Sequence, residues 1–263
     1  VNAGSLNTNL ILLNSKSKRF PNGLGNDSGL LGKYIAFHNY RARIMAEYDG
    51  LLDKHTTGRE PTNAYIPRFR NVKKQETDFL RGYACTITAW RSVIQNTEGF
   101  GDELKEGLLN PTYGPWRIRT LMMGETIPKE TNKVTLDETK VDDWGIPLLK
   151  FDVSYDENDE LMIKDFFEQL TKMYQDAGFT NIRTEDTKQA PGLDIHEMGG
   201  VRMGKDPKTS LLNKWNQMHL CKNVYVTDGA CMTSTSTQNP SLTYMAITAR
   251  ACSHAISEFK KNK

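Results

Sequence analysis

Apolar and polar residues alternate along this chain with two different periods. Over residues 156–177 apolar side chains recur every three or four positions, which is the spacing of one helix face. Gly178 follows, where a helix C-terminal cap is expected. A similar pattern that opens with Pro240 predicts a helix over residues 240–259, and a short apolar helix is predicted over residues 6–13.

The middle of the chain has the composition of strands. Five segments are rich in β-branched and aromatic residues, namely 34–48, 79–94, 116–127, 133–137 and 148–154. Two of them alternate polar and apolar residues, as strands do when one face is in water. Because turns rather than helices separate most of these segments, the pattern predicts an α+β fold with a mainly antiparallel sheet. A short buried strand is also predicted over residues 224–226.

Composition excludes several classes of function. The 34 basic and 32 acidic residues give a net charge of +2 and are spread along the 263 residues, so no basic region for nucleic acid or an anionic membrane is predicted. No apolar run approaches the roughly 20 residues of a membrane span. The four cysteines contain no C-x-x-C pair, which argues against a zinc ribbon or a disulfide scaffold. The sequence leaves the cellular compartment open.

His196 is the first candidate for acid–base chemistry. It lies on a loop ahead of Gly199 and Gly200, where missing side chains would let a flat ring approach the backbone. Histidine titrates near neutral pH and therefore suits the removal of a hydroxyl proton. A lone loop histidine is more often a structural donor, so position alone assigns no role. A second histidine at residue 200 would be needed for a zinc-protease motif, and no metal site is predicted.

Asn239 precedes Pro240, where it is placed to cap the predicted helix, a role worth about 1 kcal/mol. A helix N-terminus also presents unpaired N–H groups and partial positive charge, which would stabilise negative charge on a bound ligand. Asp228 and Gly229 follow the predicted strand, and the bare backbone of Gly229 could lie close to a cofactor.

Three motifs together resemble a known family. They are residues 196–204 (His-Glu-Met-Gly-Gly-Val-Arg-Met-Gly), 223–229 (Asn-Val-Tyr-Val-Thr-Asp-Gly) and 239–243 (Asn-Pro-Ser-Leu-Thr). In order and spacing they are similar to the C-terminal motifs of the glucose–methanol–choline (GMC) family of FAD-dependent alcohol oxidoreductases. The resemblance extends to Gly4, Gly32 and His38, which look like the family's link between cofactor and substrate domains, and it weakens over residues 40–120.

The resemblance implies FAD as the cofactor. It implies that His196 is the catalytic base with Asn239 as its partner, and that Asp228, Gly229, Asn239 and Pro240 contact FAD. The reaction would be oxidation of a CH–OH group, with a sugar or polyol the favoured substrate and flavin N5 the hydride acceptor.

The resemblance also implies a division of the chain into domains. Residues 1–32 would be a remnant of the FAD-binding α/β domain, 33–190 the substrate-binding domain, and 191–263 the C-terminal return segment of the FAD-binding domain.

Family members open with a glycine-rich strand–turn–helix for the ADP half of FAD, and no such motif is found here. Gly23 and Gly25 begin a similar pattern, but serine replaces the third glycine and no strand precedes it. We therefore expect a C-terminal fragment whose partner is the missing N-terminal half, and weak FAD binding by this chain alone. The alternative is a non-catalytic carbohydrate- or partner-binding module with Trp90, Trp116 and Trp144 as an aromatic platform, although tryptophans on sheets are more often core residues.

Overall fold

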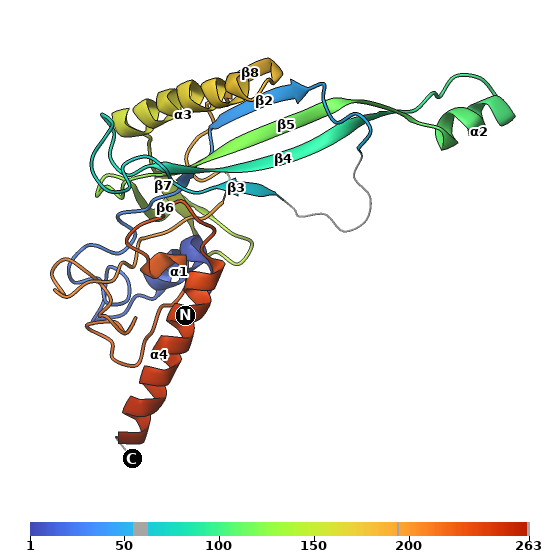
Figure 1. Ribbon diagram of the computed structural model, residues 1–263. Coiled ribbons are helices and arrows are strands. Elements are labelled where there is room, and N and C mark those ends of the chain that lie inside the picture. Colours follow the sequence, from blue (N-terminus) through green and yellow to red (C-terminus); the bar gives the residue numbers. More distant parts are fainter. Residues whose placement is uncertain (55–62, 194, 262–263) are drawn as a thin grey trace. The chain divides into compact units, whose positions relative to one another are not determined.

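A computed structural model describes residues 1–54, 63–193 and 195–261 of the chain (Figure 1). Its elements are, in order, α1 (Ser5–Asn14), β1 (His38–Asn39), β2 (Ala42–Tyr48), β3 (Ala64–Ile66), β4 (Tyr83–Ile94), α2 (Asp102–Leu109), β5 (Thr112–Glu125), β6 (Lys133–Val141), β7 (Pro147–Asp152), α3 (Glu157–Asp176), β8 (Thr180–Asp186), the 3-10 helix η1 (Gly229–Cys231) and α4 (Ser241–Lys261). The predicted α+β class is confirmed.

The chain forms two compact units. Unit 1 consists of Val1–Asn39, Gly124–Asp159 and Ala190–Lys263, and unit 2 of Tyr40–Met123 and Glu160–Gln189. The last division, between Gln189 and Ala190, lies within one residue of the predicted boundary at 190, whereas no division lies at residue 32 and residues 124–159 belong to unit 1. The assignment of 1–32, 33–190 and 191–263 to cofactor and substrate domains stays a prediction.

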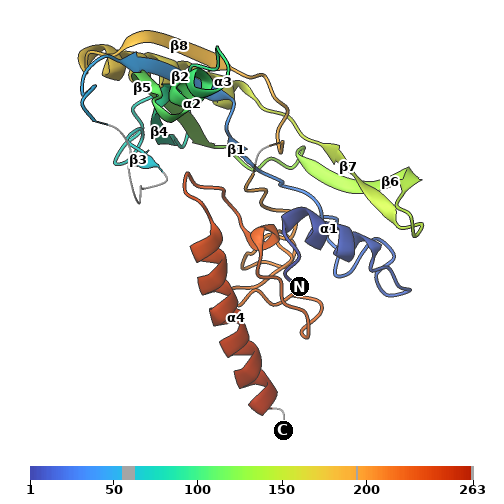
Figure 2. The ribbon, with the colours of Figure 1, turned by 90° about the vertical axis from the view of Figure 1, so that its right-hand side faces the viewer.

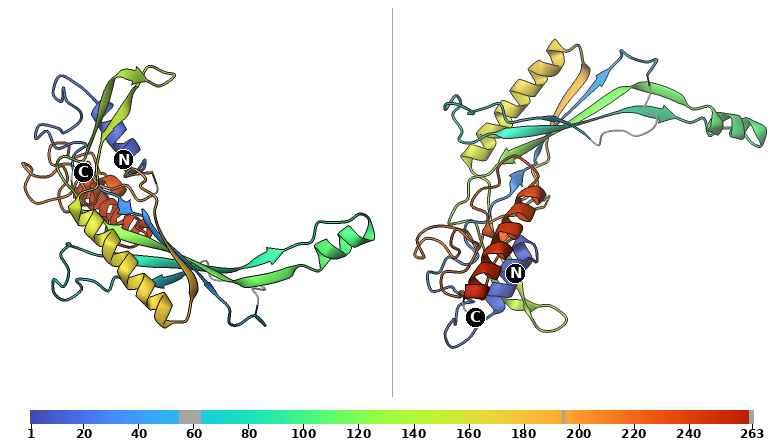
Figure 3. Two further views of the ribbon diagram at one scale, coloured as in Figure 1. Left: turned by 90° about the horizontal axis from the view of Figure 1, so that it is seen from above. Right: turned by 60° about the horizontal axis from the view of Figure 1, so that its bottom comes forward.

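Unit 2 is a twisted sheet with a helix on one face. The strand order is β3-β4-β5-β2-β8, and β2 pairs antiparallel with both β5 and β8. Alternate residues of β2 are buried, as the period of a strand requires, and Ile44 packs with Phe166 and Leu170 of α3 in one apolar core. Strands β4 and β5 continue as a long arm that ends in α2 (Figure 3).

Unit 1 consists largely of loops around α1, the β6–β7 hairpin and α4 (Figure 2). Its core joins Leu12 of α1, Ile35 and Phe37 ahead of β1, and Val134 of β6. Backbone hydrogen bonds from Ile35 to the Asn132 carbonyl (3.0 Å) and from Val134 to the Gly32 carbonyl (2.8 Å) attach the hairpin to the start of the chain. This attachment explains why residues 124–159 belong to unit 1.

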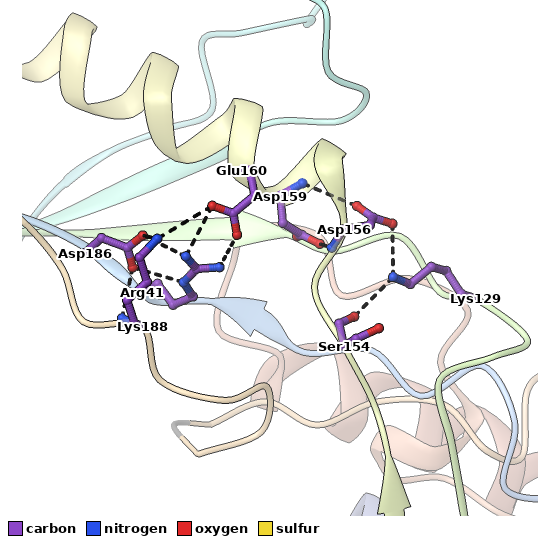
Figure 4. Close-up of polar contacts among 8 residues, drawn as sticks. All are labelled: Arg41, Lys129, Ser154, Asp156, Asp159, Glu160, Asp186 and Lys188. Atoms are coloured by element: carbon purple, nitrogen blue, oxygen red, sulfur yellow. Dashed lines mark hydrogen bonds and ion pairs between the residues drawn. The ribbon is translucent and has the colours of Figure 1, made fainter.

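Two polar clusters flank the start of α3 (Figure 4). In unit 2, the Arg41 cluster consists of Arg41, Glu160, Asp186 and Lys188: Arg41 donates to Asp186 at 3.0 and 2.7 Å and to Glu160 at 2.5 Å, and Lys188 lies 2.6 Å from Asp186. In unit 1, the backbone N–H of Asp156 donates to the Asp159 carboxylate at 3.1 Å.

The cap on α3 is reciprocal, since the Asp159 N–H donates to the Asp156 carboxylate at 3.4 Å. Lys129 Nζ lies 3.0 Å from the other carboxylate oxygen of Asp156. Asp159 is only 3% exposed, and burial raises its pKa to about 7. The cap therefore pairs one carboxylate that has a cation beside it with one that burial favours in the protonated form.

Most of the long elements were predicted within a few residues, but three predictions need correction. Residues 224–226 are not a strand, because Tyr225 forms only an isolated bridge to Gln217 and its neighbour Val226 bonds to the Asn216 carbonyl of a loop. The strand predicted over 34–48 is β1 and β2, separated at Tyr40 and Arg41.

The third correction concerns tryptophan exposure. Trp90 is 38% and Trp144 84% exposed, so neither is a core residue, and Trp144 belongs to unit 1 whereas Trp90 and Trp116 belong to unit 2. The residues that the structure describes include no helix long and apolar enough to cross a membrane.

Candidate active site

The loop that holds His196 is fixed by backbone pairing. Met198 and Ala36 exchange two backbone hydrogen bonds of 2.9 Å each, which align the loop with the segment that leads into β1. His196 itself has φ 69°, a left-handed conformation that is uncommon for a residue with a side chain. Such conformations persist where the surrounding structure determines them, and they are enriched at functional sites.

The structure brings His196 and Asn239 together, 43 residues apart in the sequence, with Asn239 Nδ2 3.5 Å from His196 Nε2. On the other side of the ring, His196 Nδ1 lies 3.0 Å from Nδ1 of His38 in β1, with the two rings edge-on at 80°. These three side chains, all of unit 1, are called the site cluster below.

Both imidazoles of the site cluster are held in the neutral form. His38 is 1% exposed, and burial lowers its pKa despite hydrogen bonds to the backbone of Thr235 and Ser236. The pKa of His196 is lowered to about 4, first by burial and then by the positive charge that His38 would carry. At neutral pH His196 therefore has an unprotonated ring nitrogen that can accept a proton.

A cavity of about 380 Å³ lies beside His196 and is also lined by Asp228, Gly229 and Pro240. Its volume is within the usual range of small-molecule pockets. The first residues of two helices, Ser5 of α1 and Ser241 of α4, line the same cavity. Helix N-termini present unpaired N–H groups, so these two residues mark places where a ligand's acceptor atoms could be bound.

Asp228 is a structural link as well as a cavity residue. It is 3% exposed, and its carboxylate accepts hydrogen bonds from the backbone N–H of Ala3 and of Ala230, each at 2.9 Å, and from the Thr8 hydroxyl. These bonds join the beginning of the chain and α1 to the turn of η1. At Gly229, a Cβ would lie 2.6 Å from the Glu197 carbonyl oxygen, so the glycine lets the His196 loop pack against this turn.

Two expectations about local geometry are wrong. A Cβ at Gly199 would meet the Tyr34 carbonyl oxygen at 2.1 Å and one at Gly200 would meet the Asn9 side chain at 2.1 Å, so protein atoms, not an open approach for a flat ring, occupy this space. The α4 helix begins at Ser241, and the Pro240 carbonyl accepts the Tyr244 N–H at 3.0 Å. Pro240 therefore takes the cap position that was predicted for Asn239.

Sequence reasoning gave His38 no chemical role, although it contacts the predicted base directly. The available indication was a histidine directly after the apolar residues 35–37. A buried polar ring in such a segment requires hydrogen-bond partners, and the partners come from distant parts of the chain. Among the residues described here, no group of three His, Cys, Asp or Glu side chains could hold a metal ion.

Comparisons with known proteins identify the family. Residues 128–248 match the family model described as GMC oxidoreductase. The chain is 30% identical to 2-methyl-1,2-propanediol dehydrogenase of Mycolicibacterium austroafricanum over 95% of this chain and 46% of that protein, and 25% identical to the fructose dehydrogenase large subunit of Gluconobacter japonicus over 98% and 47%. The chain thus spans about half the length of these relatives.

The fold also has a counterpart among solved structures. A formate oxidase of Aspergillus oryzae RIB40, the subject of a structure concerning FAD modification, superposes with a TM-score of 0.61 at 12% identity, over 99% of this chain and 54% of the oxidase. The helix-lined cavity beside a neutral histidine fits part of a flavin cofactor. The chain belongs to the GMC oxidoreductase family, whose cofactor is FAD.

Proposed function

We propose that this protein oxidises the CH–OH group of an alcohol, with sugars and polyols the favoured substrates, and that His196 removes the hydroxyl proton. Support comes from the family and from relatives named as dehydrogenases of a diol and of fructose. The observation on which the proposal depends most is the convergence of His196 and Asn239 next to the 380 Å³ cavity.

The chemistry of the pair follows from its donors and acceptors. The unprotonated Nε2 of His196 accepts the hydroxyl proton, while the Asn239 amide donates a hydrogen bond to the alcohol oxygen without competing for that proton. The carbinol carbon loses a proton from oxygen and a hydride from carbon, which leaves a carbonyl group. FAD, when bound, supplies the acceptor for the hydride and its two electrons.

Residues of this chain would hold the reactive part of the cofactor. Asp228, Gly229 and Pro240 line the cavity and Asn239 is adjacent to it, so we assign all four to FAD contact, Gly229 and Pro240 through their backbone. The N-termini of α1 and α4 would stabilise negative charge there. We expect the rest of the FAD site to come from a segment equivalent to the other half of the longer relatives.

Replacing His196 by alanine in the FAD-loaded protein tests the proposal. Loss of a general base typically lowers kcat by about 10²- to 10⁴-fold, and we expect a loss in that range with a screened alcohol and an artificial electron acceptor. His219→Ala is the matched control, because His219 is a histidine of unit 1 that bonds to Ser210 (3.0 Å) outside the cavity. A loss of less than about tenfold for His196→Ala would contradict the assignment of the base.

A further inference from the structure

His38 contacts the proposed base on the side that faces away from Asn239. It lies in β1, where its backbone is opposite Glu125 of β5, and its side chain is almost completely buried. The proposed reaction uses only Nε2 of His196, so the 3.0 Å contact between the two Nδ1 atoms is unexplained by it. Two ring nitrogens at this distance form a hydrogen bond only if one of them carries a proton.

The backbone decides which nitrogen that is. His38 Nε2 lies 3.0 Å from the Thr235 carbonyl oxygen, and because a carbonyl only accepts, Nε2 of His38 is the donor. A neutral imidazole has one N–H, so Nδ1 of His38 has a lone pair and accepts. The proton between the rings therefore belongs to Nδ1 of His196, and Nε2 of His196 is left with the lone pair.

The anchor for this arrangement is itself held in place. The hydroxyl of Ser234 donates to the carboxylate of Glu125, which is 3% exposed and is the register partner of His38. This bond holds Ser234, the residue before Thr235, in place, and Thr235 itself is only 2% exposed. A chain of contacts thus runs from β5 through the Thr235 carbonyl and His38 to the proposed base.

We propose that His38 is a positioning residue that holds His196 in the Nδ1–H tautomer and so presents the Nε2 lone pair to the alcohol. This inference rests on the proposed function, because it specifies how the assigned base is prepared. Orientation of a catalytic histidine by a third group is a general device, most often provided by a carboxylate. A neutral imidazole orients the base without adding negative charge, so His196 is not drawn into the protonated state before substrate arrives.

The tautomers can be observed without turnover. Nitrogen-15 spectra of the histidine rings in the oxidised holoenzyme, with His196 assigned from the His196→Ala variant, distinguish protonated from unprotonated ring nitrogens. We expect His196 protonated at Nδ1 and His38 protonated at Nε2 throughout the neutral pH range. A His196 ring protonated at Nε2 in the unaltered holoenzyme overturns the inference, even if no His38 variant folds.

Two variants separate positioning from simple packing. In His38→Leu the acceptor is lost, and we expect His196 to populate the Nε2–H tautomer and kcat to fall about 10- to 100-fold with KM nearly unchanged. In His38→Gln the amide oxygen can still accept, and we expect the Nδ1–H tautomer and most of kcat to be restored. His219→Leu is the control, since it removes a histidine of the same unit that contacts Ser210 instead.

The outcomes distinguish this inference from the proposed function. An unchanged His196 tautomer in His38→Leu overturns the role of His38, whatever the activity. Retained alcohol oxidation in His196→Ala overturns the proposed base, whatever the tautomer. The expected tautomer in the unaltered protein, its change in His38→Leu and its return in His38→Gln together support the positioning role.

Discussion

The site cluster and the Arg41 cluster bury polar groups in opposite ways. His38 and Arg41 are three residues apart in the sequence, one at the end of unit 1 and the other at the start of unit 2, and both are almost inaccessible, at 1% and 4% exposed. His38 contacts the neutral ring of His196 and the carbonyl oxygen of Thr235. Arg41 forms ion pairs with the carboxylates of Glu160 and Asp186, and Lys188 lies near both of these carboxylates.

The difference shows what each cluster can do. A buried charge is tolerated only with opposite charges beside it, and such an arrangement resists any change of protonation. Burial of the Asp186 carboxyl would raise its pKa, but hydrogen bonds from Arg41 and Lys188 outweigh burial and hold the pKa at about 2. In the site cluster the imidazoles contact each other and the Thr235 carbonyl instead, and a proton can be added at His196 Nε2. The Arg41 cluster therefore suits stability, and the site cluster suits proton transfer.

The largest expected effect on stability follows from breaking the charged cluster. Arg41→Met would leave Asp186, whose side chain is 15% exposed, without its main counter-charge. Removing one partner of a buried ion pair costs about 3–5 kcal/mol, and the partial exposure of the carboxylates points to the lower end, about 3 kcal/mol. Urea unfolding measures the change, with Lys172→Met as control, because Lys172 and Asp176 form an exposed pair expected to contribute less than about 1 kcal/mol. Equal losses for both variants would contradict the comparison.

His38→Leu should affect stability less than Arg41→Met does. It removes neutral hydrogen bonds and leaves the Thr235 carbonyl without its His38 donor, a loss of about 1–2 kcal/mol. The two variants should therefore rank oppositely in two assays. Arg41→Met should lose more unfolding free energy, and His38→Leu should lose more of kcat. A larger loss of unfolding free energy for His38→Leu than for Arg41→Met would show that the site cluster is mainly structural.

The two clusters should also respond to acid in separate pH ranges. An unfolded histidine binds a proton near pH 6.5, whereas His196 in the folded protein binds one only near pH 4, so this group lowers stability as the pH falls from about 6.5 to about 4. The Asp186 contribution is present above about pH 4 and is lost as the pH falls toward 2, because its pKa is lowered in the folded state.

Unfolding free energies measured between pH 7 and pH 3 test this separation. His196→Gln should gain stability relative to the unaltered protein between pH 6.5 and pH 4, because glutamine binds no proton in either state. The deficit of Arg41→Met should stay constant over that range and begin to shrink only below about pH 4. Parallel pH profiles for the two variants would contradict the assignment of the two pKa shifts.

The sequence predicted the parts of this comparison unequally, for physical reasons. The helices α3 and α4 were predictable because an apolar stripe repeats over 20 and 21 residues, whereas α2 has only 8 residues, one of them Gly107, which is too short for a stripe to repeat. His196 and Asn239 were found through motifs local in the chain. The role of His38 depends on contacts to residues 158 and 197 positions away, which no local pattern records.

Asp159 is buried like the site cluster and acidic like Asp186, and at pH 5 its replacement should give the smallest effect on stability. It is a buried acid without a cation of its own, and burial raises its pKa to about 7, so its folded form is increasingly protonated below that pH. Its contribution to stability is therefore greatest in acid and declines as the pH rises from about 4 to about 7. Asp159→Asn keeps an oxygen for the Asp156 N–H, so we expect a change within about 0.5 kcal/mol at pH 5.

At pH 8 the same variant should be more stable than the unaltered protein, because asparagine removes the buried charge. Urea unfolding at pH 5 and pH 8 measures both values, and Asp152→Asn is the control, since Asp152 is 71% exposed beside Lys133. A variant that loses stability at pH 8 would show that Asp159 is charged and compensated there, as in the Arg41 cluster. A gain at pH 8 but not at pH 5 would show that Asp159 is neutral in acid and an uncompensated buried charge at pH 8, in contrast to Asp186, which Arg41 and Lys188 keep charged and compensated.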